Sequence, residues 1–313
     1  MLKELFYILI FPGLLFVSFF GLAAEYIDRK LYARLQNRVG PPWFQPLADI
    51  IKLLGKEDII PCEANKSMFT LAPVFALTAV VTAFLYIPLW GVNSLFSFSA
   101  DIIVVLYLLT IPTLAFFIGG WYSTSLFARI GSVRCVTQLF AYEVPLFMSI
   151  LASTLMANTW SLRELALFYC KNPSYALFNV LGFVVSLIAI LGKLEKAPFD
   201  IPEAETEIVA GSFTEYSGRL LAILRMTLDV EMVVCASLLA LIFLPFGLGL
   251  PPIAAFLLFI IKVLFIVGLI SLMRTIFARM RMDQMIDFCW KYLVPLALLQ
   301  VLINLLVKVV LLK

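Results

Sequence analysis

The sequence contains no histidine, and only 14% of its 313 residues are charged, against about 25% in ordinary soluble domains. Without histidine the chain cannot bind haem through imidazole, hold a His-bound zinc ion or use a His-based nucleophilic triad. Its five cysteines lie 35 or more residues apart, so we expect no metal site or iron–sulfur cluster in this chain and interpret them as small buried apolar residues. A net charge of +3 without a separate basic block argues against nucleic acid as a partner.

What the sequence has instead is apolar surface: 63% of its residues are hydrophobic, 28 are Phe, and the mean hydropathy is +1.04. Several uncharged stretches approach 20 residues, long enough at ~1.5 Å per residue to cross a ~30 Å hydrocarbon core. We therefore predict an all-α integral membrane fold, a single transmembrane domain over residues 1–313. About eight spans are expected, at 5–24, 68–90, 102–122, 138–160, 175–192, 226–246, 251–273 and 292–312.

Proline is frequent in these spans, and each one removes a backbone donor and bends a helix. The prediction is a bundle of Pro-kinked helices, with bends at Pro12, Pro73, Pro88, Pro112, Pro145, Pro245 and Pro295.

Lysine and arginine predict the orientation. Sixteen of the 23 fall in the segments 25–67, 123–137, 193–219 and 274–291, whereas the termini and alternate loops carry only five. By the positive-inside rule these four segments face the cytoplasm. We expect a multi-pass protein of the cell membrane with both termini outside.

The first of these segments carries an amphipathic stretch at 46–55, where Leu47, Ile50, Ile51 and Leu54 fall on one helical face. This pattern predicts an interfacial helix. The arginines beside it would lie on lipid or on a docked partner, and the sequence favours neither; they are Arg29, Arg34 and Arg38.

A charge inside a span costs at least ~2.5–3.5 kcal/mol and so indicates a role; Glu143 and Lys262 are the clearest cases. Glu143 precedes Pro145 and could hold and release a proton, or could be neutralised by a nearby base to fix helix packing. Lys262 lies halfway along its span and needs a partner or a water-filled cavity. We expect that partner to be Glu143 or, less readily, Asp229 or Glu231.

The segment 195–219 gathers six acids: Glu195, Asp200, Glu203, Glu205, Glu207 and Glu215. By composition alone it is a solvated loop. However, apolar residues interleave with the acids, and the stretch between Pro198 and Pro202 predicts a rigid entry into a short helix, on which Glu203 and Glu207 would share a face. Like charges on one buried face cannot all ionise, so such a row could conduct protons.

Three segments, LQNRVGPPWFQPLADIIKLLGKEDIIP (35–61), APFDIPEAETEIVAGSFTEYSG (197–218) and MDQMIDFCWKYLVPLALLQVLINLLV (282–307), joined by FAYEVPL (140–146), resemble one membrane-protein family. It is the family of the membrane subunit 1, also called the H subunit, of respiratory complex I and of the energy-converting membrane-bound hydrogenases. The resemblance covers almost the whole chain.

The resemblance implies a hinge between a redox arm and an ion-pumping, antiporter-like arm. It implies a non-redox subunit with no catalytic centre or cofactor of its own, and iron–sulfur clusters, with a NiFe centre in hydrogenases, in partner subunits. Its expected partners are an iron–sulfur subunit and a catalytic large subunit on the cytoplasmic face, antiporter-like membrane subunits, and lipid. The residues that match the family's proton-wire region are Glu143, Asp200, Glu203, Glu205, Glu207 and Glu215. Those implied to face the redox partner are Arg29, Arg34, Arg38 and Asp49.

The sequence departs from quinone-reducing members in two places. After TEYSG it reads RLLAILRMTLDVEMVV, where those members carry a Glu-Tyr pair, and ARMRMDQ replaces their Pro-Arg-x-Arg-Tyr-Asp-Gln. These departures favour the ferredoxin-linked hydrogenase branch. We also expect three further charged residues of the spans to belong to the ion pathway: Asp229, Glu231 and Lys262. The alternatives are the quinone-binding subunit of NADH:quinone oxidoreductase and a stand-alone ion transporter, although we find no inverted repeat of the kind transporters carry.

Overall fold

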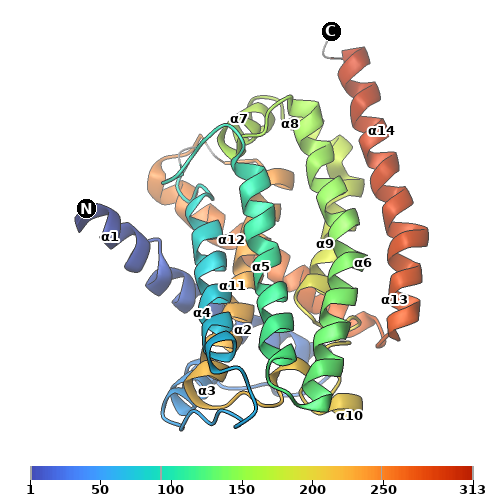
Figure 1. Ribbon diagram of the computed structural model, residues 1–313. Coiled ribbons are helices and arrows are strands. Elements are labelled where there is room, and N and C mark those ends of the chain that lie inside the picture. The colour runs from blue at the N-terminus through green and yellow to red at the C-terminus, as the bar shows by residue number, and fades with distance from the viewer. Residues whose placement is uncertain (1, 92–93, 248, 312–313) are drawn as a thin grey trace.

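Eight long apolar helical segments dominate the computed structural model (Figure 1). The structure describes residues 2–91, 94–247 and 249–311; the side chains of Leu2, Glu205, Thr206 and Leu311 lie outside the described part. Within this part, eight segments are long and apolar enough to cross a membrane, which confirms the predicted all-α membrane fold. They are Lys3–Leu35, Lys66–Leu85, Asp101–Trp121, Leu126–Ala157, Pro173–Lys193, Gly218–Phe243, Pro252–Ile276 and Met282–Val310.

Several helices continue past the predicted span boundaries at the end of the bundle that carries α3 and α10 in Figure 1, which we call the basic end. Helix α2 (Leu14–Leu35) runs eleven residues beyond the expected end at 24, and α6 (Leu126–Ala157) and α11 (Gly218–Phe243) begin before 138 and 226. Hydropathy marks only the apolar part of a helix, whereas these helices extend into charged sequence. The predicted last residue of the eighth span, Leu312, lies outside the described residues.

The prolines divide into two groups. Pro73, Pro112 and Pro145 lie inside α4 (Lys66–Leu85), α5 (Asp101–Trp121) and α6, as expected. Pro12 lies at the bend between α1 (Leu2–Leu9) and α2, inside the apolar segment Lys3–Leu35, and Pro295 lies in the first turn of α14 (Val294–Leu311), inside the helical segment Met282–Val310. Pro88 and Pro245 instead follow α4 and α11 and correct the prediction, because a residue without an N–H ends a helix more easily than it interrupts one. Helix α1 leans away from the bundle (Figure 1).

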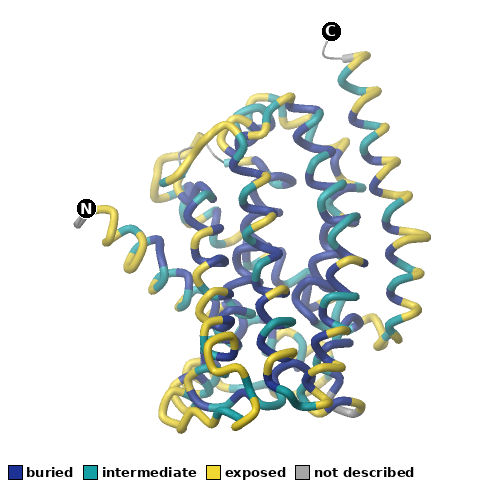
Figure 2. The backbone as a smooth tube through the Cα atoms, viewed as in Figure 1, coloured by how far each residue is buried: buried dark blue, intermediate teal, exposed yellow. Residues whose placement is uncertain are grey.

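Helix α11 forms the centre of the bundle, and 83% of its apolar stretch is buried. It packs against α2, α4 and α12 (Pro252–Ile276), while α9 (Val180–Lys193) packs on α6. Figure 2 shows the contrast with α14, which is largely exposed and leans on α6 and α9. Its buried Asn304 donates to the carbonyl oxygen of Ala152 at 2.8 Å and to Asn179 Oδ1 at 2.8 Å, which fixes α14 to the bundle.

The predicted amphipathic helix is present as α3 (Gln45–Leu54) and packs against α2 and α11. Ile50 is buried, whereas Leu47, Ile51 and Leu54 remain exposed. They line an apolar groove of about 320 Å³ between α2, α3 and α11. A partner or lipid can therefore reach this face of the helix.

The remaining elements are short. They are α7 (Leu162–Lys171), α8 (Pro173–Ala176), η1 (Leu177–Asn179), α10 (Glu205–Ile208), η2 (Gly211–Phe213), α13 (Met282–Phe288) and η3 (Cys289–Leu293). The C-terminal end of α14 and the α7–α8 turn lie opposite the basic end (Figure 1). Of the cysteines, Cys135, Cys235 and Cys289 are buried as expected, but Cys170 is half-buried and Cys62, in the loop before α4, is exposed. The interpretation as a buried residue is therefore wrong for Cys62, which lies in an exposed loop.

Candidate functional site

A cavity of about 520 Å³ lies at the basic end between α2, α3, α11, α12 and the segment 194–203; we call it the charged cavity. Its wall holds six acids and five bases: Glu25, Asp49, Glu195, Asp200, Glu203 and Asp229, with Arg29, Lys196, Arg225, Arg274 and Arg279. So many charges at the end of a membrane bundle are expensive unless they are paired and serve a purpose.

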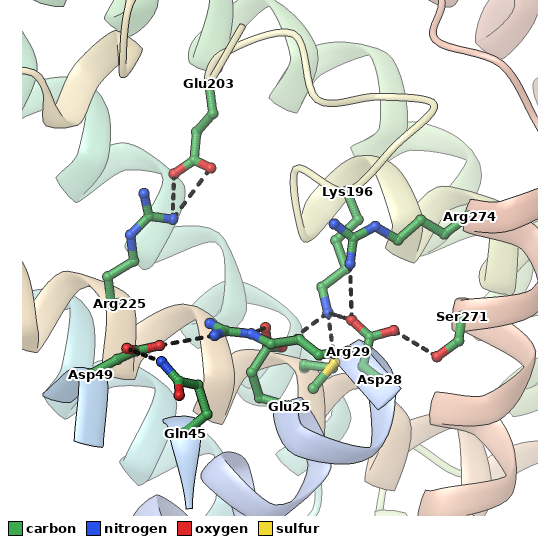
Figure 3. A network of polar contacts seen from close by, with 11 residues as sticks. Glu25, Asp28, Arg29, Gln45, Asp49, Lys196, Glu203, Arg225, Ser271 and Arg274 are labelled. Carbon is green, nitrogen blue, oxygen red and sulfur yellow. Dashed lines mark hydrogen bonds and ion pairs between the residues drawn. The ribbon is translucent and has the colours of Figure 1, made fainter. Parts of the chain in front are cut away.

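Asp28 of α2, beneath this wall, is fully buried and collects three donors (Figure 3). Lys196 Nζ lies 2.5 Å and Arg274 Nη1 3.1 Å from Asp28 Oδ2, and Ser271 Oγ donates to Oδ1 at 2.6 Å. Lys196 Nζ is also 3.3 Å from Glu25 Oε2. Burial lowers the pKa of Lys196, but the carboxylates of Asp28 and Glu25 outweigh burial and raise its pKa above the ordinary value.

Arg29 ties this cluster to the surface helix α3 (Figure 3). Its Nε lies 2.7 Å from Glu25 Oε1 and its Nη1 3.0 Å from Asp49 Oδ2, while Gln45 donates to the other Asp49 oxygen at 3.0 Å. Arg29 and Asp49, which the family resemblance implied to face a redox partner, therefore pair with each other at the wall of the charged cavity. Arg34 and Arg38 lie exposed at the basic end.

The acids of the 195–219 segment separate in the structure. Glu203 precedes α10, and its Oε1 lies 3.0 Å from Arg225 Nη1 (Figure 3). Asp200 Oδ1 lies 3.1 Å from Arg279 Nε. Glu207 lies on α10 and is half exposed, and its Oε2 lies 2.6 Å from Arg134 Nη1. The hydrogen bond from Arg134 and its positive charge lower the pKa of Glu207.

The expected shared face of Glu203 and Glu207 is thus wrong, because α10 begins at residue 205 and leaves Glu203 outside the helix. Glu215 is half-buried just after η2, and the side chain of Glu205 lies outside the described residues.

Deeper in the bundle, Lys193 at the end of α9 and Glu231 on α11 form an ion pair at 2.7 Å, with side chains only 2% and 0% exposed. Lys193 also donates to the carbonyl oxygen of Leu109 and lies 5.8 Å from the centre of the Tyr142 ring. Glu143 and Lys193 line the same small hollow between α5, α6, α9 and α11. The base near Glu143 is therefore Lys193.

Lys262 does not meet the acids expected for it. Its ammonium donates to the carbonyl oxygen of Leu244 at 2.6 Å and to that of Phe246, and lies 4.3 Å from the centre of the Phe246 ring. Because α11 ends at Phe243, these carbonyls lack helical partners and attract a cation. Lys262 therefore caps the end of α11, away from Glu143 and Glu231.

Sequence reasoning missed five of the paired charges of this site, Glu25, Asp28, Lys193, Lys196 and Arg274. Their position at the ends of apolar stretches suggested ordinary solvated helix ends. One signal was available: Glu25, Asp28 and Arg29 are spaced three and four apart, which puts them on one face of a helix.

The geometry yields a series of charges, part buried and part half-buried, that starts in the charged cavity and ends at the half-buried Glu143 inside a membrane span. Opposite charges pair along it: Asp28 with Lys196, Arg225 with Glu203, and Glu231 with Lys193. A change of charge at one member shifts the proton affinity of the next, so the series can pass an electrostatic signal or protons.

Comparison with known proteins gives consistent matches. A family model described as NADH dehydrogenase matches residues 7–305. The chain is similar to the H subunit of NADH-quinone oxidoreductase from Syntrophotalea carbinolica, at 35% identity over 97% of this chain and 96% of the relative. It is similar to the corresponding H subunit from Dehalococcoides mccartyi, at 34% identity over 95% of this chain and 85% of the relative. Among solved structures, a chain of the membrane-bound sulfane sulfur reductase, an archaeal respiratory membrane complex, matches with a TM-score of 0.84 and 25% identity, covering 97% of this chain and 98% of that one.

Proposed function

Since the chain belongs to the NADH dehydrogenase family, as the membrane H subunit of complex I-like complexes, we propose that it is a non-redox membrane anchor that couples electron transfer in partner subunits to the movement of protons or sodium ions. The observation that carries this proposal is the series of charges between the charged cavity and Glu143. Such groups are costly in a membrane protein unless their charge is used.

The coupling works through electrostatics. A change of charge in a partner docked at the basic end alters the balance among the groups of the cavity wall, including Asp200, Glu203 and Asp229. The Lys193–Glu231 pair lies between the cavity and Glu143, so a shift in either partner's charge changes the proton affinity of Glu143. Glu207 and Glu215 lie nearer the surface of the same segment and would exchange protons with solvent.

The basic end faces the cytoplasm in this proposal, and both termini face outside. An iron–sulfur subunit and a catalytic large subunit dock there, against Arg34, Arg38 and the exposed Trp43, which has 74% of its surface free. Antiporter-like subunits adjoin the bundle in the membrane. The clusters, and a NiFe centre in a hydrogenase, belong to these partners.

We favour ferredoxin as the electron donor of the complex, and protons or another small molecule as its electron acceptor. The departures from quinone-reducing members at 219–234 and 278–284 support this branch. The wall of the charged cavity also carries eleven charged side chains. Such a wall is better suited to passing on a change of charge than to binding the apolar ring of a quinone.

A second candidate, a quinone-binding subunit, is favoured by the names of the curated relatives and by the apolar groove beneath α3, which shares Ile50 with the charged cavity. Such a groove could hold an isoprenoid tail.

Purification of the tagged chain from its own membranes, followed by reconstitution into vesicles, tests these proposals. We expect iron–sulfur partners to co-purify, and reduced ferredoxin to drive ion uptake that added quinone leaves unchanged. Ion uptake that requires quinone and responds to quinone-site inhibitors would support the second candidate. A chain that purifies alone would contradict both and favour a stand-alone transporter; nickel analysis of the complex decides whether the partner is a hydrogenase.

A further inference from the structure

Glu195 occupies a backbone position where glycine is usual. It follows the last residues of α9 with φ +51°, in the left-handed region. Glu195 N–H donates to the carbonyl oxygen of Gly192 at 3.3 Å, and Lys196 N–H donates to that of Leu191 at 3.2 Å. These two bonds form the Schellman arrangement, whose left-handed residue is glycine in most helices. A glutamate here is held against its conformational preference, which indicates that its side chain has a use.

The carboxyl group of Glu195 is buried, yet it lacks a full set of partners. The residue is 7% exposed and belongs to the wall of the charged cavity. Cys135 Sγ on α6 donates to its Oε1 at 3.0 Å, and its Oε2 has no hydrogen-bond partner among the described residues. A buried carboxyl oxygen without a donor is expensive as an anion and acceptable once protonated.

Charged and polar groups from three parts of the chain act on this carboxyl. Glu203 faces it from the loop before α10, Glu231 and Arg225 from α11, and the Cys135 thiol from α6. Burial and the negative charge of Glu203 raise the pKa of Glu195 to about 8. The residue therefore changes its charge near physiological pH, between the charged cavity and the Lys193–Glu231 pair.

We propose that Glu195 is the proton-loading group of this series of charges. Cys135 acts as a positioning residue, because its S–H group holds Oε1 and leaves Oε2 free. The inference rests on the proposed coupling function and adds to it the residue at which a proton enters.

The step is a simple proton transfer. A proton from a hydronium ion in the cavity bonds to Oε2 as its bond to that water breaks, and the carboxylate becomes neutral. Loss of this negative charge weakens the electrostatic repulsion between Glu195 and Glu231. The ionised form of Glu231, which pairs with Lys193, is then favoured. Release of the proton to a water molecule in the cavity, which becomes hydronium, restores the carboxylate.

The test uses the whole complex in vesicles, with donor-driven proton uptake reported by a pH-sensitive dye and sodium uptake by a radioactive tracer. Two variants remove the carboxyl: Glu195→Gln keeps its shape, and Glu195→Gly suits the left-handed backbone, so the fold is retained in at least one. Glu164→Gln, an exposed acid on α7, is the matched control. We expect both Glu195 variants to assemble, to transfer electrons and to lose ion uptake by roughly tenfold or more, with the control unchanged.

The pH profile provides a second readout. Wild-type ion uptake should fall as the pH rises through about 8, since the loading group is then ionised, and both Glu195 variants should lose this inflection. Cys135→Ala removes a donor that favours the anion and should move the inflection to higher pH, whereas Cys135→Ser should restore it.

Normal ion uptake in both Glu195 variants, or an inflection that persists in them, would overturn the inference while leaving the coupling function intact. Wild-type vesicles that transfer electrons without any ion uptake would instead refute the coupling function itself.

Discussion

The Lys193–Glu231 pair offers the sharpest test of how charge is held inside this bundle. With the two groups 2.7 Å apart, their attraction is roughly 6 kcal/mol at an effective dielectric constant of about 20. Desolvation offsets much of that gain, so the pair itself contributes little net stability. Lys193→Met, however, leaves Glu231 as an uncompensated buried acid, and loss of one member of such a pair costs about 3–5 kcal/mol. That is a large part of the ~5–15 kcal/mol that stabilises a typical folded protein.

The assay compares three variants of the complex: Lys193→Met, Glu231→Gln, and the double replacement of Lys193 and Glu231 by Met. Thermal denaturation in detergent and the amount of assembled complex report stability, and ion uptake by vesicles reports function. We expect both single variants to be strongly destabilised. The double variant should regain stability to within about 1 kcal/mol, because apolar residues fill the space of a buried pair without its desolvation cost. It should not regain ion uptake.

Two outcomes would refute this reasoning. Single variants as stable as the wild type would show that the pair is hydrated or otherwise compensated. A double variant that moves ions at the wild-type rate would remove the pair from the coupling path.

Three further changes test other parts of the structure. Asp28→Asn should destabilise the complex by about 3–5 kcal/mol, because Lys196 and Arg274 lose the carboxylate between them, and less assembled complex should survive solubilisation. Lys262→Met should cost about 1–3 kcal/mol in thermal stability by freeing the carbonyls after α11, yet ion uptake per assembled complex should be unchanged. Asn304→Leu should cost about 1–2 kcal/mol and increase proteolysis or hydrogen exchange of α14.

The membrane spans were predictable because hydropathy is a local property of the chain. All eight appear, and so does the amphipathic helix α3. Helix ends were less predictable: α2 continues through charged sequence to Leu35, since the charges of Glu25 and Asp28 are satisfied by distant partners. A hydropathy scan records such charges as the end of a span.

The candidate site was predictable only in part, because its pairings are long-range. Glu143 was recognised from its depth in a span, but its proximity to Lys193 depends on how α6 and α9 pack. Lys196 lies 168 residues from Asp28 along the chain. Lys262 was assigned to an acid because depth alone does not reveal that α11 ends at Phe243 and presents carbonyl oxygens to it.

The central claim is that a titratable carboxyl inside the membrane couples electron transfer to ion movement, and Glu143→Gln tests it most directly. The measurement is the number of ions taken up per electron transferred by vesicles containing the whole complex. The account predicts an assembled complex that transfers electrons while its ion uptake falls to the background of protein-free vesicles, so that the ratio approaches zero. A wild-type ratio in the variant would contradict it.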